Sequence, residues 1–245
     1  MKLFRPMMLA STLFIAGQVH AATITTTGLQ SQLQSAYTGY TQDLAAAAWM
    51  NPSNSAEPHS AGIIPVGVQI ALEVAALTID PAAPQWSATG YTESTIPMPR
   101  VRLSVGIPFG LDFGYMNLPA KDLGVDLTGY EVRMAFGNYI PVPMLEANVR
   151  FHTSTLTVTD LEVKNTGFAA MIGANLPFVK PYIEFGTVKS TSSVTGALAS
   201  FQQLDESNST MAIGAKVEFA FMVLNLEKSK VGDKDLTTAK FGFEF

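Results

Sequence analysis

Apolar and polar residues alternate with a period of two through most of this chain, from residue 64 to the C-terminus, in short blocks that turn residues separate. In the first block Val68 and Ile70 would share one face, and Gln69 and Glu73 the other. A period of two is typical of β-strands whose two faces meet different surroundings. The blocks predict an all-β fold of about ten antiparallel strands, and an even number returns both ends to one side.

Two fold classes fit this alternation, and they differ in where the apolar face points. A soluble β-sandwich or lipocalin-like barrel buries its apolar face, whereas a transmembrane barrel turns that face to lipid. Hydrophobic residues make up 47% of the chain and charged residues 14%, yet no segment after the N-terminal leader approaches 18 unbroken apolar residues. The spread of apolar residues therefore favours a transmembrane antiparallel up-and-down β-barrel over residues 63–245.

The C-terminal residues favour the same interpretation. Phe241, Phe243 and Phe245 alternate with a lysine, a glycine and a glutamate. They resemble the closing strand that the barrel-assembly machinery of the bacterial outer membrane recognises, with an aromatic residue at the end and another two before it. The resemblance implies that these phenylalanines face lipid and form the assembly signal, with the assembly machinery as a partner during biogenesis.

The N-terminus predicts export. Lys2 and Arg5 precede an apolar core over residues 7–17, and residues 19–21 form a small-residue cleavage site. This arrangement is typical of a signal peptide over residues 1–21, whose core is too short to span a bilayer as a helix. We therefore predict a protein of the cell outer membrane, with outer-membrane lipid and lipopolysaccharide as partners.

Composition and spacing argue against several other functions. No cysteine occurs, so disulfides and thiolate sites are excluded. A formal net charge of -5, without a run of Lys or Arg, argues against binding nucleic acid. His152 and Ser154 would share a strand face, with Asp160 in the next loop, but a His–Ser pair without an assigned acid is more often incidental than catalytic. His59 lies too far from His152 in sequence to indicate a metal site. We expect no enzyme, no metal and no cofactor.

The connections between the blocks fall into two groups by length. Short ones lie at residues 108–110, 138–143, 177–181 and around 221, and long ones at Asp80–Ser94 and Ser190–Ser209. Because outer-membrane barrels have short periplasmic turns and long extracellular loops, we predict that the short group faces the periplasm. Aromatic residues near the short turns would form the girdle at that interface: Phe109, Phe136, Tyr139, Phe178, Phe221 and Phe245.

One segment before the barrel has a helical period. It carries, between residues 28 and 49, the stripe Leu29, Leu33, Tyr37, Tyr40 and Leu44, and Asn51-Pro52 ends the pattern. We predict a periplasmic plug helix and linker over residues 22–62. Inward glycines near the short turns would either serve the curvature of the wall or leave room for this helix in the periplasmic half of the lumen. They are Gly67, Gly106, Gly114, Gly137, Gly173, Gly186 and Gly242.

Charged residues occupy many positions predicted to face the lumen. They are Glu73, Arg100, Arg102, Asp112, Glu131, Arg133, Glu146, Arg150, Glu184, Lys216 and Glu218, together with Glu227, Lys240 and Glu244. A barrel of about ten strands leaves little open water, so we expect most of these charges to pair across the lumen. The alternative is an ion-selectivity constriction, which would favour one sign of charge more clearly.

The stretch from Ile96 to Gly110, with the preceding helix and Asn51-Pro52, resembles small outer-membrane barrel proteins. More distantly it is similar to the long-chain fatty-acid transporter superfamily, in which an N-terminal helical plug ends near an Asn-Pro-Ala motif. Ser53 stands here in place of the Ala. The resemblance implies porin-like passive or gated passage of a small solute, hydrophobic solutes included. The alternative is a structural or adhesive surface protein that acts through Asp80–Ser94 and Ser190–Ser209.

Overall fold

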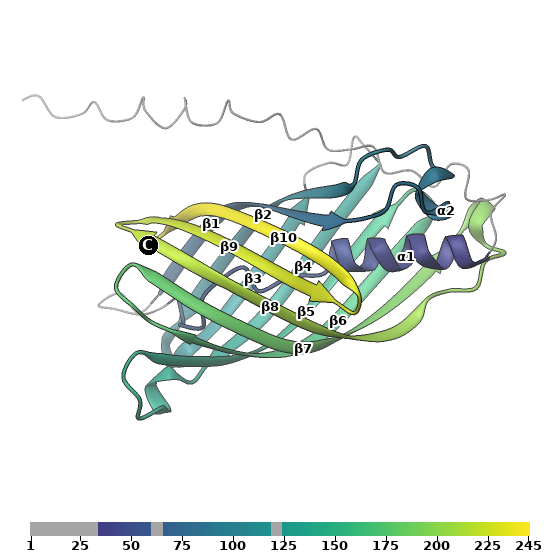
Figure 1. The fold of residues 1–245 in the computed structure, drawn as a ribbon. Coiled ribbons are helices and arrows are strands. Elements are labelled where there is room, and N and C mark those ends of the chain that lie inside the picture. Colours follow the sequence, from purple (N-terminus) through teal and green to yellow (C-terminus); the bar gives the residue numbers. More distant parts are fainter. Residues whose placement is uncertain (1–33, 60–65, 119–123) are drawn as a thin grey trace, which may run out of the picture.

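The structure is a computed structural model that describes residues 34–59, 66–118 and 124–245. Ten antiparallel strands form a closed barrel in which each strand pairs with the next and β10 closes against β1 (Figure 1). This confirms the predicted up-and-down β-barrel. The predicted signal peptide, Leu29 and Leu33 lie outside the described residues. The strands are β1 (Gly67–Thr78), β2 (Thr95–Ile107), β3 (Leu111–Leu118), β4 (Val125–Ala135), β5 (Leu145–Val158), β6 (Leu161–Ala174), β7 (Val179–Val194), β8 (Asp205–Phe219), β9 (Met222–Val231) and β10 (Lys234–Glu244).

The period-two pattern decides which side chains face the lumen. In β1 Gln69 and Glu73 are buried, whereas Ile70 and Leu72 on the outer face are 52% and 46% exposed. Most exposed large side chains toward the short-turn ends of the strands are apolar or aromatic, and most charged side chains among the buried residues come from the same strands. A soluble barrel has the opposite arrangement, with charge outside, so the alternation here is that of a transmembrane barrel.

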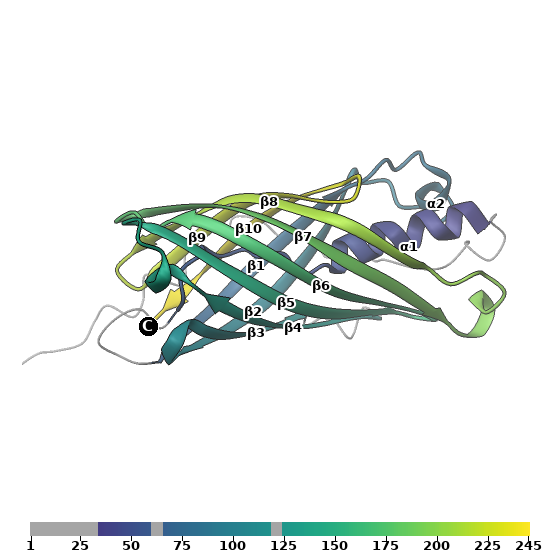
Figure 2. The ribbon, with the colours of Figure 1, turned by 90° about the horizontal axis from the view of Figure 1, so that it is seen from below.

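The apolar outer band ends at a level of aromatic residues. Phe151 and Phe168 are cross-strand partners on β5 and β6, and the next outward-facing pair along these strands is Thr153 and Thr166. Strands β5 to β8 have 14 to 16 residues, more than any other strand, and extend further than the others toward the β7–β8 link (Figure 2). Beyond the aromatic level their outer faces carry polar residues such as Lys164 and Lys189. One end of the barrel wall therefore projects beyond the apolar band.

The two ends of the barrel carry different connections. The start of β1, the end of β10 and the links β2–β3, β4–β5, β6–β7 and β8–β9 lie at one end, called here the short-turn end. The opposite, long-loop end carries the β1–β2 link with α2 (Pro84–Ser87) and the β7–β8 link with η5 (Gly196–Leu198). The short-turn links β2–β3 and β4–β5 contain η2 (Pro108–Gly110) and η4 (Gly137–Tyr139).

The loop predicted over Ser190–Ser209 is wrong in its bounds. Ser190 pairs with Glu206, so β7 and β8 continue into this stretch and only residues 195–204 form the link. Two other links at the long-loop end are two-residue turns, at 159–160 and 232–233, and the β4–β5 link at the short-turn end spans 136–144. The difference in length between the two ends is therefore smaller than predicted. Strand ends outside the apolar band meet water on their outer face, so hydrophobic alternation did not mark them as strands.

Aromatic residues gather at the short-turn end, as predicted from the sequence. Five of the six predicted girdle residues are more than half exposed, from Phe221 at 51% to Phe109 at 88%. Phe136, the sixth, is half-buried. A group of exposed aromatic side chains at one end of a barrel wall is typical of a membrane interface.

The C-terminal residue takes part in closing the barrel. The backbones of Phe245 and Val68 exchange two hydrogen bonds of 2.9 Å, and the ring of Phe245 stacks on Phe221 with centroids 6.2 Å apart. Deleting Phe245 should therefore lower the yield of assembled barrel, because it removes both the last backbone bonds of β10 and the terminal aromatic side chain. The yield is measured as the fraction that migrates differently on a denaturing gel before and after boiling.

The matched control for this deletion is Ser200→Ala, at an exposed position of the β7–β8 link. Phe201→Ala is unsuitable, because the Phe201 ring stacks on Tyr37 at 4.7 Å and is not a free loop side chain. Equal yields for the Phe245 deletion and Ser200→Ala would contradict a role of Phe245 in assembly.

Candidate functional site: the filled lumen

Helix α1 (Gln34–Ala48) lies inside the barrel, with its N-terminal end at the long-loop end (Figures 1 and 2). Tyr37, Tyr40 and Leu44 are fully buried. They belong to one apolar core with wall residues near the long-loop ends of their strands, among them Leu77, Met98, Leu127, Leu156, Val163 and Leu236. The predicted position of the helix in the glycine-lined, short-turn half is therefore wrong. An apolar stripe needs an apolar wall, and only the long-loop half of the lumen supplies one.

The helix ends where wall side chains take over its free carbonyl groups. The last turn of any helix leaves carbonyl oxygens without partners inside the helix. Here three wall residues donate to them: Asn165 to Ala45 at 2.8 Å, Arg100 to Ala47 at 2.6 Å and Ser154 to Ala48 at 2.7 Å. Two residues separate Asn51-Pro52 from the last helical residue, and the proline prevents the helix from continuing. The wall thus fixes the C-terminal end of α1 in the middle of the lumen. Among the described residues, no helix is long and apolar enough to cross a membrane.

Residues 49–59 continue from the helix to the short-turn end without regular secondary structure, and nearly all of them are buried. We call residues 34–59 the plug segment. Wall side chains bind its backbone at successive positions: Arg100 to the carbonyl of Trp49 (3.0 Å), Arg150 to Met50 (2.7 Å), Arg102 to Asn51 (2.9 Å), Arg133 to Ser55 (3.0 Å) and Asn148 to Ala56 (2.9 Å). Glu227 accepts the amide of Ser53 at 2.8 Å. The plug segment therefore fills the lumen from end to end.

The arginines that bind this backbone also pair with acids on the wall. Glu73 lies 3.5 Å from Arg100 and 3.0 Å from Arg102, and Arg150 lies 2.8 Å from Glu131 and 2.7 Å from Glu184. A guanidinium has five donors in a fixed fork, so one arginine serves a carboxylate and a carbonyl at once. Each of these six buried charges has an opposite partner, as expected for ions removed from water.

A second group of charges closes the short-turn end. The plug residue Glu57 pairs with Lys180 and Lys216, and Lys216 also lies 2.8 Å from Glu244. His59 Nδ1 lies 3.1 Å from Asp112 and 2.8 Å from Arg133 Nη2, and Arg133 Nη2 is 2.6 Å from the same Asp112 oxygen. The plug segment therefore contributes its own charged and polar side chains to the wall network at this end.

The predicted lumen charges thus lie where the alternation put them, with two qualifications. Glu73, Arg100, Arg102, Asp112, Glu131, Arg133, Arg150, Glu184 and Lys216 are buried in the lumen, and all of them form ion pairs. Glu218 is one-quarter exposed and pairs with Lys180 and Lys216. Within the described part of the chain Glu146 forms no ion pair, and its Oε2 has no hydrogen-bond partner. Most charges pair across the lumen, so neither sign dominates.

The inward glycines make room for neighbouring side chains and for residues 49–59. A Cβ on Gly114 would overlap the side chain of Glu131, and a Cβ on Gly173 would lie 3.2 Å from the Cβ of Ala56 in the plug segment. Both positions therefore need a residue without a side chain for a reason of space. The space beside these glycines, predicted to admit a helix, is instead occupied by large polar side chains of the wall and by the irregular chain of residues 49–59.

The long-loop mouth is closed by contacts of α1 with the β1–β2 loop and with the start of β10. Asp43 accepts the indole N–H of Trp86 at 2.7 Å and lies 2.8 Å from Lys234. The Trp86 ring packs between Tyr40 and Tyr91. Burial raises the pKa of Tyr91, whose hydroxyl donates to the carbonyl of Thr95 at 2.6 Å, so this loop phenol stays neutral. The β1–β2 loop is thereby fixed over the end of the helix.

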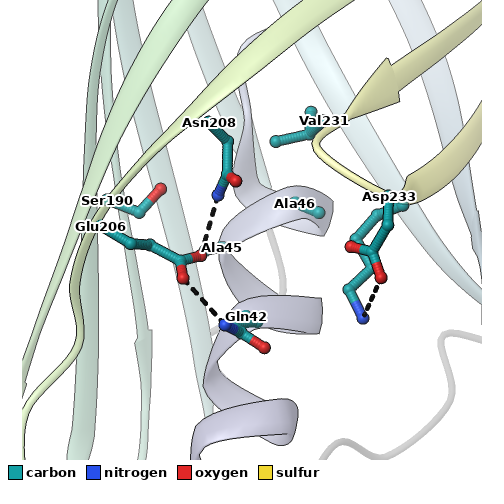
Figure 3. Close-up of a pocket in the computed structure, with 9 residues that line it drawn as sticks. Gln42, Ala45, Ala46, Ser190, Glu206, Asn208, Val231 and Asp233 are labelled. Carbon is teal, nitrogen blue, oxygen red and sulfur yellow. Dashed lines mark hydrogen bonds and ion pairs between the residues drawn. The ribbon is translucent and has the colours of Figure 1, made fainter.

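Beside α1 the mouth retains two cavities. One, of about 40 Å³, lies between α1, β8 and the β9–β10 turn, where Gln42 donates to Glu206 at 2.8 Å and Asn208 donates to the same carboxylate (Figure 3). The other, of about 370 Å³, is lined by four carboxylates and one lysine: Asp43, Asp80, Asp233, Asp235 and Lys234. The smaller cavity is lined mainly by polar groups, whereas Ile79 and Ala83 also line the larger one, so a solute that enters there meets charged and apolar groups together.

The candidate catalytic residues are occupied by structural contacts. Ser154 donates its hydroxyl to the carbonyl of Ala48, and His152 Nε2 lies 3.4 Å from the indole nitrogen of Trp49. Asp160 lies in the β5–β6 turn. Across residues 34–59, 66–118 and 124–245, no group of three His, Asp or Glu side chains is arranged to hold a metal ion.

Sequence reasoning did not single out the uncharged side chains that hold the plug segment. Asn148 and Asn165 bind its carbonyls, and Tyr182 donates to Glu227 at 2.6 Å, which in turn binds Asn51. All three face the lumen. Their strand parity was a usable signal, because a buried Asn or Tyr hydroxyl on an inward position needs a hydrogen-bond partner.

Comparison with known proteins adds fold-level likeness only. No protein-family model matches this chain, and no protein of curated function matches it. Solved structures similar to it include the N-terminal β-barrel domain of Pseudomonas aeruginosa OprF (12% identity, TM-score 0.37, 73% of this chain and 97% of that one). Others are the β domain of the Bordetella autotransporter BrkA (11%, 0.42, 74% and 99%) and Ail, the attachment invasion locus protein of Yersinia pestis (14%, 0.27, 74% and 97%).

At these identities, and with TM-scores below 0.5, the likeness carries no argument about activity. Similarity to the long-chain fatty-acid transporters is not among these findings and stays a prediction.

Proposed function

We propose that the protein is an outer-membrane β-barrel whose lumen is closed by its own plug segment, and that a small solute passes only when this segment moves. The outer-membrane location is supported by the apolar outer band, its aromatic borders and the predicted export signal. The observation that carries the closed state is the series of buried arginines bonded to the carbonyls of Ala47, Trp49 and Met50.

The lining favours a polar solute over a hydrophobic one. Below α1 the wall presents paired Arg, Lys, Glu and Asp side chains, and the cavity of about 370 Å³ at the long-loop mouth is lined by four carboxylates. An apolar solute that crosses this charged region would separate paired wall groups and offer them no polar partner in return. Leaving a buried charge unpaired costs several kcal/mol.

Loosening the helix anchors tests the gate. In Ser154→Ala with Asn165→Ala, the carbonyls of Ala48 and Ala45 lose neutral wall partners, and no charge is left unpaired. Each lost bond should destabilise the closed state by about 1 kcal/mol, so the two together, at about 2 kcal/mol, should make brief openings about 30-fold more frequent in single-channel recordings from planar bilayers.

The matched control is Thr153→Ala, on the outer face of β5 next to Ser154, where Thr153 Oγ1 donates to the carbonyl of Asn165. It removes a hydroxyl from the same strand pair without touching the plug segment. Equal opening frequencies in the control and in the double variant would contradict a gate made by α1.

A second candidate function is a structural or adhesive surface role. It is favoured by the projection of β5 to β8 beyond the apolar band, which places polar outer faces where a partner could contact them. The same recordings separate the two functions, because a surface protein with a permanent plug shows no openings in the wild type under any voltage.

A further inference from the structure

The plug segment has a fixed direction through the barrel. Its first described residue, Gln34, lies at the long-loop mouth and exchanges two hydrogen bonds with the backbone of Gln202 in the β7–β8 link, at 2.8 and 3.1 Å. Tyr37, one turn further, stacks on Phe201 of the same link. At the other end of the segment His59 lies against Asp112, at the start of β3 and near the short-turn end.

This direction is opposite to the one expected for a plug that enters from the periplasm. β1 starts and β10 ends at the short-turn end, so an ordinary periplasmic plug would begin there and return there. Here the chain instead runs once through the lumen, from the long-loop mouth to the short-turn end, before the first strand begins (Figure 1).

The apolar core determines this direction. Tyr37, Tyr40 and Leu44 are buried against wall residues of the long-loop half, and the polar stretch 49–59 is buried against the charged half. Reversing the segment would place the tyrosines and Leu44 among the buried arginines and leave those arginines without the carbonyls that they bind. The reversed segment would therefore leave buried arginine donors without acceptors, and an unpaired buried polar group costs free energy.

We infer that α1 enters the barrel from the cell surface, so that its N-terminal end is presented outside the cell beside the β7–β8 link. The inference rests on the proposed function, which places the short-turn end in the periplasm. It adds a second role to the barrel: the barrel presents the first turn of α1 on the surface, anchored by the rest of the helix in the lumen.

The absence of cysteine allows a direct test of sidedness. Ser35→Cys places one thiol at an exposed position of the first helical turn. Ser200→Cys, exposed in the β7–β8 link, marks the long-loop end, and Tyr139→Cys, 74% exposed, marks the short-turn end. Each full-length variant is treated in intact cells with a maleimide linked to a polymer too large for porins, then again after the outer membrane is permeabilised.

Ser35→Cys should be labelled in intact cells as completely as Ser200→Cys, whereas Tyr139→Cys should gain its label only after permeabilisation. Ser35→Cys that stays unlabelled in intact cells, beside a labelled Ser200→Cys, overturns the inference. If Ser200→Cys itself is unlabelled and Tyr139→Cys is labelled, the proposed orientation of the barrel fails instead. Labelling of purified protein in detergent supplies the reference for full reactivity, and a Ser35→Cys thiol that does not react there also overturns the inference.

Discussion

Deletion of residues 34–59 should turn a barrel with negligible conductance into a steadily conducting pore. The deletion removes a helix about 10 Å across together with the chain that continues it, and the paired charges of the wall would then be hydrated by water in an open lumen. Conductance in planar bilayers at fixed salt measures the change. Because nearly the whole plug segment is buried in the wild type, this is the largest functional effect that the structure predicts.

The deletion is informative only if the barrel still assembles. Heat-dependent migration on a denaturing gel provides that control, and a variant with Ser154→Ala and Asn165→Ala provides an intermediate that keeps the whole chain. A deletion variant that assembles and remains closed would show that the seal is made elsewhere, and it would remove the basis of the proposed gate.

Replacing Arg150 with Met should lower the free energy of unfolding by about 3–5 kcal/mol, the usual cost of removing one partner from a buried ion pair. Arg150 joins Glu131, Glu184 and the carbonyl of Met50, so all three lose a donor at once. Urea unfolding in lipid vesicles measures the loss. Trp49, one of two tryptophans in the chain, has the Arg150 guanidinium 5.9 Å from its ring centroid, and its fluorescence reports the site.

Two variants complete the Arg150 experiment. Arg150→Met with Glu184→Met removes both members of the closest pair and should recover part of the lost stability, because one orphaned carboxylate disappears. Lys189→Met breaks an exposed pair, 3.0 Å from Asp205, and should cost less than about 1 kcal/mol. If Arg150→Met costs no more than Lys189→Met, the lumen network does not stabilise the barrel.

The fold was predictable because strand parity is a local property of the sequence. Once Glu73 and Arg102 were assigned to one face and Ile70 and Leu103 to the other, burial of the charges followed from the pleat alone, and the structure agrees at each of these positions. Strand ends outside the apolar band, such as Ser190–Val194, were missed, because their outer face is polar and the contrast between faces disappears there.

The position of the helix was not predictable from its own period. Tyr37, Tyr40 and Leu44 show that one face needs an apolar surface, but the half of the barrel that offers it depends on which inward residues become neighbours on different strands. Inward positions such as Leu127 and Leu156 are cross-strand partners in the folded barrel and lie 29 positions apart in the sequence. Glycines near the short turns gave a misleading indication of space, which side chains such as Glu131 fill.

Residues 49–59 carry no periodic pattern, so their course could not be derived from the sequence. Their partners come from many strands, among them β2, β4, β5 and β9, and only the closed barrel brings these together. A buried segment without regular secondary structure must find donors for its carbonyls in the surroundings. The available clue in the sequence was that four arginines occupy inward positions, since one arginine can serve a carboxylate and a carbonyl together.

The arginines of the wall bind backbone oxygen, an atom that every residue type carries. Exchanging Met50 or Ala56 for another side chain of similar volume therefore leaves the bonds from Arg150 and Asn148 in place. Within residues 49–59, sequence identity matters mainly where the plug segment contributes its own side chains to the network, at Asn51, Glu57 and His59. The stretch between these positions is thus free to drift in evolution, or to be rewritten by design, while the barrel stays sealed.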